Sequence, residues 1–189
     1  MRQTLIFACF LALACSGAES ADAGLLAVDR PETGPNAALA VTSPAFSANG
    51  TIPLTFSPYG QGRSPALSWS GVPAGAKSLV LMMEDPDATS AKPFIHWLAW
   101  NIDPSLRGLP EASVPAGIRE GRNGRGSAAY FGPRPHGSKP HHYHFQLFAL
   151  DRMLDLPAGA DRDRLLAAMS GHVLAKGDLV GLFAQPRGR

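Results

Sequence analysis

Three segments of the sequence hold most of the side chains that could do chemistry. They are the Asp-Pro-Asp run at residues 85–87, the histidine at position 96, and the stretch 132–143, which includes His141 and Tyr143. An aspartate that accepts a hydrogen bond from an imidazole fixes the ring tautomer or favours its charged form. A tyrosine hydroxyl and the N–H groups of a glycine-rich loop supply further donors. Such a set of groups suits the binding of an anion.

Each segment taken alone also has a structural explanation, which the sequence leaves open. Aspartates on both sides of a proline commonly form a turn. A histidine on an apolar strand face is usually a hydrogen-bonded core residue. Four histidines lie between residues 136 and 144, but strand alternation divides them between two faces. We therefore expect neither a metal nor another cofactor.

The elements that must position these groups are short strands. Residues 78–83 form a continuous apolar run, which predicts a strand buried on both faces, and an acidic segment follows it at the sheet rim. Residues 95–102 and 141–150 predict two further strands. Period-two geometry places His96, Leu98, Trp100 and Ile102 on one face, and His141 with Tyr143 on one face of the other strand.

These strands could bring four side chains to one edge of the sheet, where they would form a pocket: Asp85, His96, His141 and Tyr143. The remaining pattern predicts strands at 52–56 and 66–69, a long ordered loop at 117–137, a helix at 161–170, and a final strand at 179–184 after a turn at Gly177 and Asp178.

Composition favours a globular, β-rich chain. The sequence is 45% hydrophobic and 17% charged, and its 20 glycines and 17 prolines are spread along the chain. Many short strands joined by turns fit this distribution better than long helices. The net charge is only +2 and no long basic run occurs, so we expect no nucleic-acid partner.

The N-terminus is typical of an exported protein. Arg2 precedes an apolar stretch at 4–14 that is too short to span a bilayer, so residues 1–15 predict a signal peptide. Residues 11–15 also match a lipobox, in which Cys15 would become lipidated and tether the protein to a membrane. The alternative is ordinary cleavage at Ala18 or Ala23, which would give a soluble periplasmic or secreted protein.

The remainder divides into a tether and one domain. Residues 16–40 are rich in Ala, Gly, Ser, Pro and acidic residues, which predicts a flexible tether. Residues 41–186 predict a single domain. Both cysteines lie in the signal segment, so this domain has no thiol for a disulfide or for nucleophilic attack.

Several motifs together resemble the phosphatidylethanolamine-binding protein family, in its bacterial Raf kinase inhibitor-like branch. They occur in the expected order between about residues 46 and 183: SPALSW at 64–69, DPDA at 85–88, HW at 96–97, GRN at 121–123, YFGPRP at 130–135, HHYHF at 141–145 and MSGH at 169–172. Two positions depart from the family pattern, because Thr89 and His136 stand where proline is usual.

The resemblance implies a mainly β fold, in which a large antiparallel sheet packs on a smaller sheet with short peripheral helices. It also implies an anion pocket at the sheet edge, lined by Asp85, His96, His141 and Tyr143. The backbone of 132–135, with Gly132, Pro133 and Pro135, would form one wall of this pocket, and Asp87 would support the entrance loop.

Three functions are compatible with these residues. We favour an exported binding protein for a small anion or a phosphate-bearing head group. A regulator of a partner protein, such as a kinase or a protease, is the alternative. A hydrolase is a third hypothesis, in which His96 or His141 would act with Asp85 on an ester or phosphoester. Because no serine lies in a Gly-x-Ser-x-Gly turn and no thiol remains, catalysis is the weakest of the three.

Overall fold

The computed structural model describes residues 24–34 and 37–186 and confirms the mainly β fold. Within this part, one short helix, α1 (Arg162–Met169), accompanies ten strands and three 3-10 turns. The strands are β1 (Ala37–Ala38), β2 (Ala40–Thr42), β3 (Gly50–Thr51), β4 (Leu67–Ser70), β5 (Ser78–Asp85), β6 (Phe94–Ile102), β7 (Gly108–Leu109), β8 (Arg119–Glu120), β9 (His141–Leu150) and β10 (Val173–Phe183). The 3-10 turns are η1 (Ala27–Asp29), η2 (Pro31–Thr33) and η3 (Leu54–Phe56).

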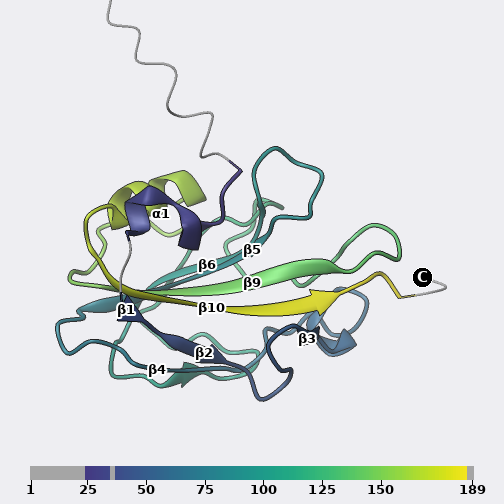
Figure 1. Cartoon of the computed structure of the whole chain (residues 1–189), viewed down its shortest axis with the longest axis horizontal. Coiled ribbons are helices and arrows are strands. Elements are labelled where there is room, and N and C mark those ends of the chain that lie inside the picture. The colour runs from purple at the N-terminus through teal and green to yellow at the C-terminus, as the bar shows by residue number, and fades with distance from the viewer. Residues whose placement is uncertain (1–23, 35–36, 187–189) are drawn as a thin grey trace, which may run out of the picture.

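The strands form two sheets in separate layers. The larger sheet has seven strands in the order β1-β10-β9-β5-β6-β8, with β3 also pairing to β10. Its long strands are antiparallel, whereas the short β1 and β3 run parallel to β10. The smaller sheet is β2-β4-β7 and covers one face of the larger sheet, while α1 and the N-terminal turns cover the other (Figure 1).

Alternating residues of β5 divide the core between these layers. All eight residues of β5 are buried, as its continuous apolar run predicts. Leu79, Leu81 and Met83 pack between the two sheets, and Val80 and Met82 pack towards α1. The central strand therefore has no solvent-facing side, and polar residues at its end must find partners inside the protein.

Strand β6 carries two irregularities that change the predicted distribution of its side chains. Opposite β5, the pairing passes from Trp97 to Ile95 and leaves His96 as an extra residue. A second shift leaves out Asn101, which has a positive φ of 58°. The prediction of one shared face is therefore wrong: Leu98 and Trp100 pack towards α1, Ile102 packs between the sheets, and His96 lies against Tyr143. Such bulges re-aim single side chains next to functional sites.

Two other predicted elements differ from the structure. Residues 54–56 form the turn η3 in place of the strand predicted at 52–56. Gly177 lies inside the continuous strand β10 and does not turn before it. At Gly177 a Cβ atom would come within 2.2 Å of the Leu39 carbonyl oxygen, so this glycine permits the neighbouring backbone to approach β10 closely.

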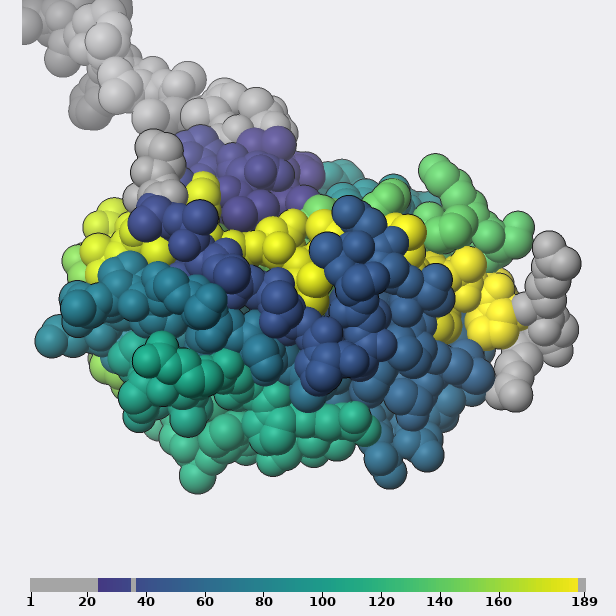
Figure 2. Space-filling model, turned by 60° about the horizontal axis from the view of Figure 1, so that its bottom comes forward, coloured from purple at the N-terminus to yellow at the C-terminus, as the bar shows by residue number. Residues whose placement is uncertain are grey.

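The predicted tether is wrong for the part that the structure describes. Residues 24–34 form η1 and η2, in which Ala27 and Thr33 are fully buried, and β1 and β2 begin before residue 41. The composition of this segment resembles a linker, but a small residue at position 27 lets its backbone pack directly on the sheet. Figure 2 shows β10, in yellow, as a band between this purple segment and the blue segments that follow it.

The predicted signal peptide and Cys15 fall within residues 1–23, which lie outside the described residues. Over residues 24–34 and 37–186, no helix has both the length and the apolar character needed to cross a membrane.

The contact at Gly177 gives a stability prediction. Gly177→Ala should destabilise the protein by about 1–3 kcal/mol, because the new methyl group overlaps the Leu39 carbonyl and must push the backbones apart. Thermal and denaturant unfolding measure the change. Gly75→Ala is the matched control, because its nearest contact is an ordinary 3.7 Å to the Leu174 side chain. Equal stability of the two variants would contradict this account of Gly177.

Candidate anion-binding site

A cavity of about 300 Å³ lies where the end of β5 meets the beginnings of β6 and β9, at one edge of the larger sheet. Antiparallel pairing brings these three strand ends together. The cavity is lined by Asp85, Ala88, Thr89, Ser90, Phe94, His96, Arg125, Phe131, Arg134, Pro135, His136 and His141. Three of the four residues predicted to line the pocket are in this set.

Asp85 links the two interpretations that the sequence left open. One carboxylate oxygen accepts the N–H of Asp87 at 2.8 Å, which closes the predicted turn. The other lies 2.9 Å from Nδ1 of His141. Because a carboxylate accepts, Nδ1 of His141 carries the proton and the tautomer of this ring is fixed. The same side chain therefore shapes the loop and orients a histidine in the cavity.

His96 is held from the other side of the cavity. Its Nδ1 lies 2.7 Å from the carbonyl oxygen of Phe131, and its ring stacks on that of Phe131 at 5.6 Å between centroids. A carbonyl can only accept, so Nδ1 donates and the neutral ring keeps a lone pair on Nε2. Burial lowers the pKa of His96 to about 4. In the free protein His96 is therefore neutral at pH 7 and must gain a proton before Nε2 can donate.

Tyr143 lies beneath the cavity and does not line it. Its side chain is fully buried, and its ring meets the His96 ring nearly at right angles, with 5.1 Å between the ring centroids. Burial, reinforced by the negative charge of Asp85, raises the pKa of Tyr143, so the hydroxyl keeps its proton. Among the described residues this hydroxyl has no hydrogen-bond partner. A buried donor without a partner in this position is unusual.

The predicted wall at 132–135 contributes in two ways. Arg134 and Pro135 line the cavity, whereas Gly132 and Pro133 are buried behind it. A Cβ atom on Gly132 would come within 2.1 Å of the Phe56 carbonyl oxygen. The wall can therefore pack against the η3 turn only because this residue is glycine.

Asp87 lies outside the cavity lining and is bonded to the beginning of β9. Its carboxylate accepts from both the backbone N–H and Nδ1 of His142, each at 2.7 Å. Burial alone would raise the pKa of Asp87, but these hydrogen bonds outweigh it and lower the pKa. The interaction ties the loop after β5 to the first residues of β9.

Two arginines at the cavity were missed by the sequence reasoning. Arg125 and Arg134 are exposed and line the cavity, and the Arg125 guanidinium lies 5.4 Å from the centre of the Phe131 ring. They come from the loop predicted at 117–137, but spacing in a loop does not show which way a side chain points. With Asp85 paired to His141, they make the mouth of the cavity electropositive.

The described residues contain no group of three or more His, Cys, Asp or Glu side chains that could hold a metal ion. The histidines of β9 are instead paired one by one with aspartates, as in the 2.7 Å contact of His144 with Asp178. These pairs lie on different faces of the strand. The arrangement is that of separate hydrogen-bonded rings and not of a coordination sphere.

Solved structures share this fold. A homologue from Chlamydia trachomatis, described as a phosphatidylethanolamine-binding protein homologue, is 38% identical with a TM-score of 0.75 and covers 79% of this chain and 99% of its own. YbcL from Escherichia coli, described as a member of the mammalian family, is 27% identical with a TM-score of 0.74 and covers 79% of this chain and 100% of its own.

Sequence relatives give the same assignment. A UPF0098 protein of Methanothermobacter thermautotrophicus is 45% identical over 74% of this chain and 94% of its own length. A Mycobacterium tuberculosis protein named as a candidate lipoprotein, LppC, is 37% identical over 77% of this chain and 72% of its own. The model of the family described as phosphatidylethanolamine-binding protein matches residues 42–184. These residues contain every strand around the cavity, and the chain belongs to the phosphatidylethanolamine-binding protein family.

Proposed function

We propose that this protein binds a small anion, or the phosphate-bearing head group of a larger molecule, in the cavity between β5, β6 and β9. The observation that carries the proposal is the cavity itself, in which two oriented histidines face inward and two arginines lie at the mouth. Its only lining carboxylate, among the described residues, is already paired with His141. A volume of about 300 Å³ fits a head group and is at the lower end of ligand pockets.

The hydroxyl groups that line the cavity favour a binding function over hydrolysis. Among the described residues that line it, only Thr89 and Ser90 carry a hydroxyl. Ser90 donates to the carbonyl of Lys92 at 2.5 Å, and neither hydroxyl is hydrogen-bonded to a histidine in the described structure. A serine or threonine nucleophile needs an adjacent base, so an activated nucleophile is not assembled here.

We propose further that the protein is exported and tethered to a membrane through Cys15. The motif at residues 11–15 and the likeness to the LppC protein support this proposal. The motif lies in residues 1–23, which precede both the docked segment at 24–34 and the family match that begins at residue 42. Labelling with a radioactive fatty acid, with Cys15→Ala as the control, tests it; no label on the wild type would leave a soluble exported protein.

Loss of His96 or His141 should abolish most of the affinity for anions. His96→Ala and His141→Ala are each expected to weaken binding of phosphate or phosphoethanolamine by about ten- to a hundredfold, as for a charge-assisted hydrogen bond. Calorimetric titration measures the affinity. His172→Ala is the matched control, because His172 pairs with Asp151 at the opposite end of β9. Equal affinities in all three variants would place the anion elsewhere.

The same proteins separate binding from catalysis. We expect no turnover of ester or phosphoester substrates by the wild type. Turnover that both His96→Ala and His141→Ala abolish would instead establish a hydrolase. Failure of the wild type to bind any of the anions would shift the proposal to the regulator of a partner protein.

The state of His96 predicts a pH dependence. An anion beside Nε2 favours the imidazolium form, so binding should take up a proton and raise the pKa of His96 above its value of about 4 in the free protein. Affinity should therefore rise as pH falls, by up to about tenfold per pH unit for one proton. The gain is lost as pH rises through the pKa of the complex.

Sulfate is the probe for this measurement, because it does not titrate between pH 5 and pH 8, in contrast to phosphate. His96→Gln should show a smaller slope of affinity against pH. An affinity for sulfate that stays constant or increases with pH would contradict the assignment of His96.

The arginines at the mouth should contribute weakly and electrostatically. Arg125→Gln and Arg134→Gln are each expected to weaken sulfate binding by up to about fivefold, because exposed charge pairs are strongly solvated. High salt should remove the difference from wild type. Arg107→Gln, which changes an exposed arginine beside the smaller sheet, is the control. A loss that persists in high salt would mean a direct, buried contact.

A further inference from the structure

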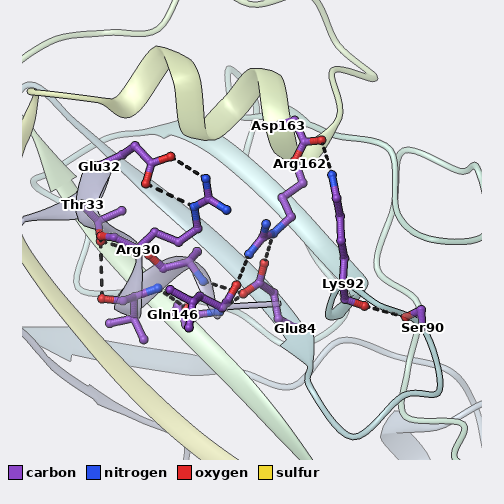
Figure 3. Close-up of polar contacts among 12 residues, drawn as sticks. Arg30, Glu32, Thr33, Glu84, Ser90, Lys92, Gln146, Arg162 and Asp163 are labelled. Carbon is purple, nitrogen blue, oxygen red and sulfur yellow. Dashed lines mark hydrogen bonds and ion pairs between the residues drawn. The ribbon is translucent and has the colours of Figure 1, made fainter. Parts of the chain in front are cut away.

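Residues 24–34, here called the N-terminal strap, pack on the outer face of the larger sheet beside α1 (Figures 1 and 3). The strap lies before the region that matches the family model, which begins at residue 42. Its docking surface, by contrast, is formed by residues inside that region. The strap therefore precedes the matched region but is bound by residues within it.

The centre of the docking surface is the carboxylate of Glu84, which is fully buried. One oxygen accepts both the backbone N–H of Ala27 and the side-chain amide of Gln146, each at 2.8 Å. The other accepts Nε of Arg162 at 2.5 Å (Figure 3). A buried carboxylate is tolerated only when it is paired and hydrogen-bonded, so the strap supplies one of the donors that Glu84 requires.

The neighbouring side chains bind more of the strap backbone. The Gln146 side-chain oxygen accepts the N–H of Val28 at 2.6 Å, and Nη2 of Arg162 donates to the Leu25 carbonyl at 2.6 Å. Nζ of Lys176 donates to the Val28 carbonyl at 2.7 Å. Four polar backbone groups of the strap are thus held by charged or amide side chains of the sheet and α1, which is far more specific than packing of an apolar segment.

Glu84 also adjoins the backbone that carries two cavity residues, Asp85 and His96. Along β5 it precedes Asp85, and adjacent strand residues point to opposite faces, so one carboxylate meets the strap while the next faces the cavity. Across the sheet Glu84 pairs with Ile95, directly beside the bulge that turns His96 towards the cavity. Displacement of Glu84 would therefore move the backbone that carries Asp85 and supports His96.

We propose that the strap positions the anion site through Glu84: when the strap is docked, Glu84 holds the end of β5 and the adjoining bulge in the arrangement that binds an anion. Glu84 is then a positioning residue, and the strap is a regulatory element attached to the binding domain. The inference rests on the function proposed above. Because coupling between two binding events is reciprocal, anion binding must strengthen docking of the strap by the same factor.

Two substitutions in the full chain separate the effect of strap docking from the effect of an added negative charge. Ala27→Glu places a second carboxylate at a fully buried position beside Glu84 and should release the strap. Leu25→Glu makes the same charge change at a side chain that is 37% exposed and should leave the strap docked. Hydrogen exchange of the amides at positions 27 and 28 measures docking directly, because both are hydrogen-bonded to the sheet.

The expected result has two parts. Ala27→Glu should raise amide exchange at Val28 at least tenfold and weaken sulfate binding at least fivefold, whereas Leu25→Glu should change neither. In the wild type, saturating sulfate should slow amide exchange at Ala27 and Val28. The fold-change should equal the fold-loss of sulfate affinity that release of the strap causes. A merely structural contact would not show this second effect.

Failure of the coupling proposal can be distinguished from failure of the proposed binding function. If Ala27→Glu exchanges fast but binds sulfate like the wild type, the strap does not position the site, while the binding function stands. If the wild type binds no sulfate, both proposals fall. Val28→Pro, which removes the donor to Gln146, is the second variant should Ala27→Glu leave the strap docked; unchanged sulfate binding with fast exchange at Ala27 would again overturn the coupling.

Discussion

Strand β5 ends in two consecutive carboxylates inside the protein, and each requires its own partners. Glu84 is satisfied on the outer face by Arg162, Gln146 and the backbone of the strap. Asp85 is satisfied on the inner face by His141 and its own turn. Because both carboxylates are buried, loss of either set of partners would destabilise the folded protein. The positions of α1, of the first residues of β9 and of the N-terminal strap all follow from this requirement.

Much of this arrangement was predictable because it depends on local patterns. The uninterrupted apolar run of β5, the alternation in β9 and the acidic start of α1 each specify an element without reference to the rest of the chain. The positions of Asp85, His96 and His141 near strand ends were enough to predict that they lie at one edge of the sheet. The family motifs then gave the arrangement of the sheets, which local patterns do not determine.

What could not be predicted depends on contacts between distant residues. Alternation assumes a regular strand, so it could not show that a bulge re-aims His96. Glycine usually indicates a turn, yet Gly177 is inside β10 because Leu39 lies against it. The composition of the strap indicates solvent exposure, and only the buried partners contributed by Glu84 and Gln146 order it.

The alternating faces of β5 limit where residues can be inserted or deleted during divergence. A deletion of one residue within β5 would exchange the faces of Glu84 and Asp85, so that the longer acid would meet His141 and the shorter one the strap. No single substitution could correct both mismatches. Insertions and deletions are therefore expected to accumulate in the loop at 86–93, where they alter the shape of the cavity mouth while the strand keeps its frame.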